Sequence, residues 1–600
     1  MTMEWLAKRY AIGLDIGDGE SCLAWTDTED HTEPVVYTRP VTQERSVLTA
    51  TARARDGAWV FGEQALMVGD AVQFTVNVKR PPETDLQTPD SVLFAQLLLG
   101  EFFTRHPELR DDCHVVVGHP SGWPAGAVDI YRRALTSSTV PVSLLSESQS
   151  ALVHVWERDT DGPLDNVLIV DVGSSTTDFT IIRDLEPRNI PLGADVGCRE
   201  IDAELATSAM AALGGKPAFQ RAMDRPDAAM LLRLACRRAK EAQFSGATFI
   251  LHDRPEALDP ALAPIFDLAT GWLRTQDIKH LVARTGGWAD RFEALLTEVR
   301  AWLTVPPALL VLTGGGSRMD VVAARCRAVF PESDLDHDPE PSFSVARGLA
   351  GAGRHQARVA RFRQEMTGLP QIPEVEEAIR EHTLTTFEET KQVVLARLRA
   401  AKTADWSKEV DSLPSSEADA QRTENGLDRI IRPHAEAICR RYGIDVEIGT
   451  SIKLTPGRMF TLNYVGRIAV ASTSPQVLSA AASSGRPAVP INPATVQLLA
   501  KAVAGGVAAV RQHGFAAAVG RGARVGGKYA LITGGVVAAG LAIAVGTDKV
   551  MDVRHRKAFL ATVEAAELPN EFVADLVADL SSEISRVVNE SVAPLLKLVS

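Results

Sequence analysis

The segment that most constrains the fold is an apolar run near position 170 that ends in an acid and a small polar turn. Val167–Val170 is apolar, Asp171 follows it, and Asp178–Ile182 has the composition of a returning strand. The turn contains Gly173, Ser174, Ser175 and Thr176. Backbone N–H groups and hydroxyls in such a turn can surround phosphate oxygens, and the acid can hold Mg²⁺ through water. An ordinary Gly-Ser hairpin is the alternative for this segment taken alone.

Two further segments make the nucleotide interpretation stronger. Near the N-terminus, the strand-like run from Tyr10 carries the acid Asp15 and then a turn with Gly17, Asp18, Gly19 and Ser21. Far downstream, Leu309–Thr313 leads into Gly314, Gly315, Gly316 and Arg318, and a helical pattern covers 321–329. Glycines let a backbone approach a base and ribose closely. Two acid-bearing hairpins and a glycine-rich turn therefore predict a nucleotide held between two lobes.

In this order the three segments resemble the two phosphate motifs and the adenosine motif of the actin and heat shock protein 70 superfamily. The resemblance covers about residues 9–355. It implies an α/β fold, a two-lobed actin-like ATPase domain related to ribonuclease H. It also implies ATP and Mg²⁺ as cofactors, with Asp15 and Asp171 near the metal.

The same resemblance implies roles for four more side chains. Lys79 matches the lysine that reaches the γ-phosphate, and Glu147 matches the glutamate that orders the attacking water. Lys240 matches a ribose-contacting lysine, and Phe244 replaces a small polar residue of the family, so it could stack on the base. The alternatives are a solvated lysine at 79, a helix-start acid at 147, and a solvated basic helix face around 240.

The first hairpin departs from the heat-shock pattern at its turn. The chaperones carry two threonines where this chain has Asp18 and Gly19. The pattern Asp-x-Gly-x-Gly is more similar to plasmid-segregating, actin-like filament proteins. Asp18 would either recruit a cation or repel the γ-phosphate and slow turnover.

The resemblance ends near residue 355, and the rest of the chain differs from a chaperone. Residues 356–425 are predicted to form helical segments and a polar linker at 412–424. Residues 426–600 are predicted to be mainly helical, with Gly/Ala-rich apolar helices. Regularly spaced strands of a peptide-binding sandwich are not evident. The tail from 564 to 598 has an amphipathic helical pattern suited to a partner helix.

Residues 529–547 are 19 uncharged residues, or ~28 Å of helix, which nearly matches a bilayer core of ~30 Å. Their high Ala and Gly content favours weak insertion, so this segment predicts either membrane contact or a buried helix pair.

The composition excludes some function classes. A net charge of -13 argues against nucleic acid as a partner. The six cysteines are widely spaced and fit a reducing compartment. No signal-peptide pattern precedes the first strand, so we expect a cytoplasmic protein, with membrane association as an open possibility.

Together these features predict a slow, Mg²⁺-dependent ATPase of the heat-shock-chaperone type. Its nucleotide state would be transmitted to an unknown protein client or partner through the helical C-terminal region. An actin-like filament protein, a membrane-associated ATP-binding scaffold and a small-molecule kinase are the alternatives.

Overall fold

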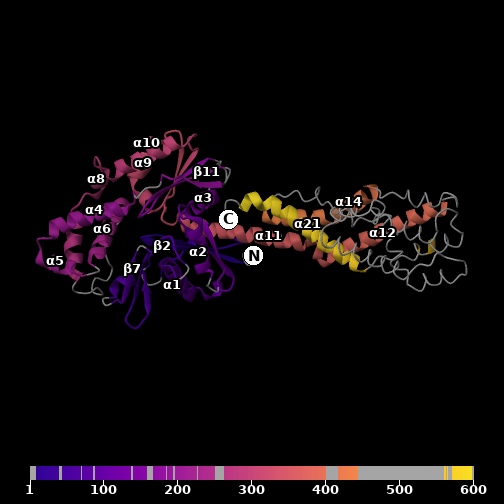
Figure 1. The fold of residues 1–600 in the computed structure, drawn as a ribbon, viewed down its shortest axis with the longest axis horizontal. Helices are drawn as coiled ribbons and strands as arrows, with labels where there is room; N and C mark the ends of the chain where they lie inside the picture. The colour runs from indigo at the N-terminus through magenta and orange to yellow at the C-terminus, as the bar shows by residue number, and fades with distance from the viewer. Residues whose placement is uncertain are drawn as a thin grey trace, which may run out of the picture. The chain divides into compact units, whose positions relative to one another are not determined.

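The computed structural model describes residues 8–400, 417–443 and 560–596, with short gaps. The gaps are 40–42, 69–70, 77, 85–87, 137–139, 159–165, 184–185, 193–195, 226–227, 247, 250–261, 562–563 and 565–569. The chain has a mixed α/β structure that divides into two compact units (Figure 1). Unit 1 is Met1–Arg361 with Ala593–Ser600, and unit 2 is Phe362–Val592.

The first sheet of unit 1 is built around a hairpin and two parallel neighbours. Its order is β3-β2-β1-β8-β9, and β4 also pairs with β2. The strands are β1 (Tyr10–Ile16), β2 (Glu20–Asp27), β3 (Val35–Val36), β4 (Val47–Leu48), β8 (Cys113–His119) and β9 (Val142–Ser146). β1 is antiparallel to β2 but parallel to β8, and β8 is parallel to β9. The carboxyl ends of β1, β8 and β9 therefore share one edge.

The second sheet repeats this plan but has no counterpart of β4 among the described residues. Its order is β12-β11-β10-β13-β14, with β10–β11 and β11–β12 antiparallel and β10–β13 and β13–β14 parallel. The strands are β10 (Val167–Val172), β11 (Thr177–Arg183), β12 (Glu186–Asn189), β13 (Leu309–Thr313) and β14 (Asp334–His337). Both sheets thus place one acid-bearing hairpin beside parallel strands.

A third, small sheet and the helices complete unit 1. The small sheet has the antiparallel order β6-β5-β7, from Trp59–Phe61, Ala50–Arg53 and Gln73–Val76. Helices of the first half are α1 (Asp90–Arg105), α2 (Ala125–Leu135) and α3 (Glu147–Arg158). Helices of the second half are α4 (Arg199–Leu213), α5 (Pro217–Met223), α6 (Ala228–Ser245), α7 (Thr270–Leu273), α8 (Ile278–Ala283), α9 (Trp288–Trp302), α10 (Asp320–Val329) and α11 (Ser344–Gly368). The bounds of α10 confirm the helix predicted at 321–329.

The two sheets are joined by a shared apolar core that contains α3 and α11. This core includes Val116 of the first sheet, Ile169 of the second, Leu152 of α3 and Leu349 of α11. The two helices cross closely: a Cβ on Gly348 would lie 1.7 Å from the carbonyl oxygen of Ser150. Because a protein interior is close-packed, this contact fixes the hairpins relative to each other.

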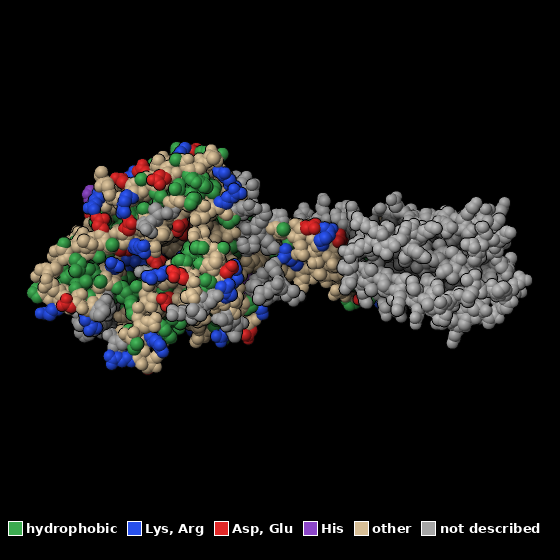
Figure 2. Space-filling model, in the orientation of Figure 1, with side chains coloured by type: hydrophobic (Ala, Val, Ile, Leu, Met, Phe, Trp, Pro, Cys, Tyr) green, Lys and Arg blue, Asp and Glu red, His purple; other side chains and the backbone are tan. Residues whose placement is uncertain are grey.

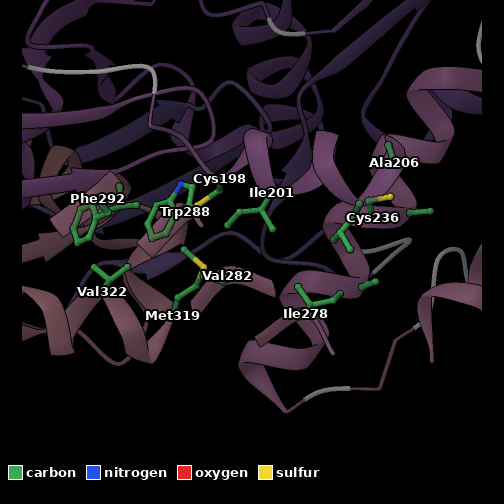
Figure 3. Close-up of a cluster of buried hydrophobic side chains, with 14 of the residues drawn as sticks. Cys198, Ile201, Ala206, Cys236, Ile278, Val282, Trp288, Phe292, Met319 and Val322 are labelled. Carbon is green, nitrogen blue, oxygen red and sulfur yellow. The ribbon is translucent and has the colours of Figure 1, made fainter. Parts of the chain in front are cut away.

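The second sheet has its own larger core on the side of α4, α6, α9 and α10. Figure 3 shows Trp288 beside Cys198, Phe292 and Met319. The Trp288 ring stacks on Phe292 at a centroid distance of 5.2 Å, and its indole N–H donates to the Gly197 carbonyl over 3.3 Å. The core thereby fixes the loop that runs behind the second hairpin turn.

Unit 2 is helical in its described part. Its elements are the C-terminal end of α11, a 3-10 turn at Leu369–Gln371, α12 (Pro373–Ala400), α14 (Glu417–Tyr442) and α21 (Asn570–Leu596) up to Val592. Buried side chains include Ile379 of α12, Ile431 of α14 and Leu580 of α21. The predicted amphipathic tail is confirmed, since Val573, Leu576, Val577 and Leu580 are all buried.

One local prediction is wrong, and others concern residues that the structure does not describe. The polar run predicted as a linker at 412–424 is helical from Glu417, because Glu, Ala, Gln and Arg are good helix formers despite their polarity. The apolar segment 529–547 and most of 426–600 lie outside the described residues. Among the helices that the structure describes, none combines the length and apolar character needed to cross a bilayer.

Candidate functional site

Three acids of unit 1 lie at the carboxyl ends of parallel strands, and a lysine contacts one of them. Asp15 is on β1, Asp171 is on β10, Glu147 begins α3, and Lys79 follows β7. The Lys79 Nζ atom lies 2.7 Å from Glu147 Oε1, and both side chains are more than four-fifths buried. Asp15 and Asp171 both interact electrostatically with this pair. Lys79 and Glu147 thus form a direct ion pair, and Asp15 and Asp171 lie close enough for their charges to interact with it.

The two aspartates sit in surroundings that disfavour their charge. Burial raises the pKa of Asp171 to about 8, Glu147 and Asp178 add repulsion, and Lys79 acts against this. Burial likewise raises the pKa of Asp15 to about 7, where Lys79 opposes and Glu147 reinforces the shift. Both residues nevertheless keep part of their surface accessible. Several carboxyl groups therefore share one ammonium group, and the two aspartates are not fully enclosed.

Lys79 remains a cation in this environment. Burial by itself would lower its pKa, but Glu147 and Asp15 outweigh that effect and raise the pKa above its ordinary value. The alternative interpretation of Lys79 as a solvated surface lysine does not fit the structure, because only 17% of its side chain is exposed. A buried, permanently charged ammonium beside acids is a group that can stabilise phosphoryl oxygens.

The first hairpin turn is fixed by backbone contacts, and its predicted hydroxyl is turned into the protein. A Cβ on Gly17 would lie 2.0 Å from the Glu20 carbonyl oxygen, so this position requires glycine. The Ser21 hydroxyl is fully buried and lies 2.8 Å from the Thr49 hydroxyl. Ser21 is therefore engaged in joining β2 to Thr49, and it does not accompany Asp15 at the site.

The second hairpin turn is held by the loop behind it. Gly173 N–H donates to the Thr176 carbonyl over 2.9 Å, and Arg199 N–H donates to the Ser174 carbonyl over 2.8 Å. The Thr176 hydroxyl donates to Asp178 over 2.8 Å. The turn consequently has a defined shape, and Thr176 orients an acid that lies across the hairpin from Asp171.

The two turns contact each other directly. The Ser175 hydroxyl, in the second turn, donates a hydrogen bond to the carboxylate of Asp18, in the first. On the same side, the guanidinium of Arg237 lies over Gly19 and is 3.2 Å from Glu20. Figure 2 shows Lys, Arg, Asp and Glu side chains intermixed over the visible face of unit 1.

The glycine-rich turn after β13 adjoins the second acid. Gly314 has a φ of +78°, and a Cβ there would lie 2.4 Å from Asp171 Oδ1. Gly316 packs on Val172, whereas Gly315 and Arg318 are exposed. The structure therefore brings this turn to the Asp171 side of the site and leaves the Arg318 side chain at the surface.

The two residues of helix α6 predicted to contact the nucleotide, Lys240 and Phe244, have contacts within the protein instead. Lys240 is buried, 2.7 Å from Asp202 Oδ1, and donates to the Cys198 carbonyl over 3.1 Å. Its ammonium is thus engaged in holding α6 against the loop behind the second turn. Phe244 packs on the second core, and its ring lies 5.5 Å from the Lys279 ammonium.

Two residues near the site, Asp178 and Asp202, were not assigned a role there from the sequence alone. Asp178 stands opposite Asp171 in the hairpin register, and burial raises its pKa. Asp202 pairs with Lys240. Only Asp178 carried a usable signal, since a residue at the start of the returning strand must face the end of the outgoing one.

The donor set suits a hard cation held through water. Among the described residues, no three His, Cys, Asp or Glu side chains are close enough together to chelate a metal directly. The partly accessible carboxyl groups of Asp15 and Asp171 are oxygen donors, which fits a hydrated Mg²⁺ whose charge would favour their ionised forms. No protein-family model matches this chain, and a search of curated proteins also finds no match.

Proposed function

We propose that unit 1 is an actin-like ATPase domain whose two large sheets are the two lobes. The single observation that carries the proposal is the Lys79–Glu147 ion pair, whose charges interact with Asp15 and Asp171 at strand ends of two sheets that share a five-strand order. These residues lie far apart in the sequence, and each came from a separate motif of the heat shock protein 70 resemblance. The proposed reaction is slow hydrolysis of Mg-ATP.

Each group has a part that its position suits. Lys79 would counter the charge on the transferring phosphoryl group, and Glu147, which already contacts Lys79, would orient the attacking water. Asp15 and Asp171 would hold the waters of Mg²⁺. The metal would neutralise phosphate charge. The turns at 17–19, 173–176 and 314–316 would supply backbone N–H groups to phosphates and ribose.

Hydrolysis would act as a switch that unit 2 transmits to a protein partner. Helix α11 runs from unit 1 into unit 2 without interruption, so a change at its N-terminal end has a continuous path. We propose that the protein works in the cytoplasm, with membrane contact through 529–547 as a further hypothesis. Flotation of the full chain with liposomes tests that contact.

The test compares Lys79→Ala with Arg80→Ala in the full chain. Lys79 is buried beside Glu147, whereas the neighbouring Arg80 is exposed. We expect Lys79→Ala to lower the rate of phosphate release from ATP by on the order of 10²-fold or more. Arg80→Ala should leave the rate nearly unchanged. Wild-type turnover in the Lys79 variant would exclude this site.

An actin-like filament protein is the second candidate, and the acid–glycine pair at Asp18 and Gly19 favours it. ATP-dependent light scattering of the purified chain separates the two functions. A rise in scattering that reverses on hydrolysis would favour the filament, whereas a steady signal with turnover would favour the switch.

A further inference from the structure

We infer that Asp18 is a specificity-determining residue that disfavours a nucleoside triphosphate relative to the diphosphate. The inference rests on the proposed nucleotide site and names how that site discriminates between its ligands. Its starting point is the hydrogen bond from the Ser175 hydroxyl to the Asp18 carboxylate. A hydroxyl in a phosphate-binding turn has one proton to donate, and here an acid of the opposite turn accepts it.

The donor side of this contact is rigidly placed. A Cβ on Gly197 would lie 2.3 Å from the carbonyl carbon of Ser175, so the turn rests directly on the loop behind it. That loop also donates from Cys198 N–H to the Gly173 carbonyl over 3.1 Å. Lys240 in turn holds the Cys198 carbonyl. Ser175 therefore presents its hydroxyl at a position that the second lobe determines.

The acceptor side is held as well. Thr49 N–H donates to the Gly19 carbonyl over 3.0 Å, which ties the first turn to its own lobe. A Cβ on Gly19 would lie 2.1 Å from an Arg237 nitrogen, so α6 packs directly on this turn. Arg237 also bridges Glu20 and Glu241, at 3.2 and 2.8 Å. The backbone that carries Asp18 is thus fixed opposite Ser175.

In this arrangement a terminal phosphate and the Asp18 carboxylate would compete for the Ser175 hydroxyl. A terminal phosphate placed between the turns would need the Ser175 hydroxyl, and it would lie close to the Asp18 carboxylate. Like charges a few ångströms apart repel strongly in a partly buried site. The triphosphate must therefore displace Asp18, whereas a diphosphate leaves the contact between the turns in place. The alternative role, a ligand to a cation, would make Asp18 favour the triphosphate.

The experiment measures the Kd of ADP and of a non-hydrolysable ATP analogue by calorimetry, with Mg²⁺ and with EDTA. The variant is Asp18→Asn, which keeps the size and removes the charge. Glu298→Gln, an equal charge change on the exposed surface of α9, is the matched control. We expect Asp18→Asn to tighten analogue binding by on the order of tenfold and to leave ADP within about twofold. If Asp18→Asn does not fold, the same affinities are measured with Asp18→Ser.

The outcomes separate the inference from the proposed function. If wild type binds both nucleotides and Asp18→Asn leaves their affinity ratio unchanged, Asp18 does not set the specificity. If the variant weakens binding in Mg²⁺ but not in EDTA, Asp18 is a cation ligand and the inference is wrong. If neither wild type nor variant binds either nucleotide, the proposed function itself fails.

Discussion

Two hairpins occupy the same place in two sheets of the same strand order, yet their turns present opposite chemistry. The β1–β2 turn carries the acid Asp18, and Glu20 begins the returning strand, whereas the β10–β11 turn carries the hydroxyls of Ser174, Ser175 and Thr176. Each outgoing strand keeps one aspartate near its end. The comparison teaches that the repeated strand order fixes the positions of the two aspartates. The turns differ, because the second turn donates the hydrogen bond that the first turn accepts.

The largest expected effect tests whether the two strand-end aspartates are equivalent. We expect Asp15→Asn and Asp171→Asn each to lower the rate of ATP hydrolysis by on the order of 10²–10³-fold, since both would hold the waters of one metal. Steady-state phosphate release at saturating Mg²⁺ measures it. Asp56→Asn, at an exposed loop of the small sheet, is the control. A wild-type rate in either variant would break the equivalence.

A smaller effect concerns the pH dependence of stability, to which Asp171 of the second hairpin should contribute more than Asp15 of the first. The pKa of folded Asp171 is about 8, far above its ordinary value of 3.8, so the folded state holds the proton more tightly than the unfolded state. Its stabilising contribution is complete below about pH 4 and is lost as the pH rises through about 8. Asp171→Asn removes this titration.

Thermal unfolding in EDTA without nucleotide measures this loss. Between pH 6 and pH 9 the wild-type midpoint should fall more than that of Asp171→Asn, and at pH 9 the variant should be more stable by roughly 2–4 °C. The same comparison for Asp15, whose pKa is about 7, should show its change at lower pH. Parallel pH profiles for wild type and Asp171→Asn would contradict the assignment of the raised pKa.

The smallest effect distinguishes the hydroxyls of the two hairpins. Ser21 is buried against Thr49, so Ser21→Ala should cost about 1 kcal/mol of unfolding free energy and leave nucleotide affinity unchanged. Thr176 is partly accessible and orients Asp178 in the second turn, so Thr176→Ala should weaken nucleotide binding a few-fold. Calorimetric titration and denaturant unfolding measure the two quantities. A loss of nucleotide affinity in Ser21→Ala would contradict this difference between the hydroxyls of the two hairpins.

The sequence by itself indicated the two acid-bearing hairpins, the strand before the glycine-rich turn and the helix that follows it. Apolar runs such as Val167–Val170 are buried on both faces of a sheet, so their character is readable without knowing their neighbours. The acids and glycines at strand ends are equally local signals. Lys79 and Glu147 were found through the resemblance, and the geometry joins them at 2.7 Å.

Only the tertiary structure decided which polar side chains face the site and which serve the fold. Ser21 and Lys240 have the residue types a nucleotide needs, but Thr49 and Asp202, from elsewhere in the chain, engage them in the interior. Asp18 likewise gained its partner from a turn 157 positions away. A pattern along the chain records the chemistry a side chain could offer. Its partner depends on long-range packing, because a buried polar group must be satisfied by whatever the fold brings beside it.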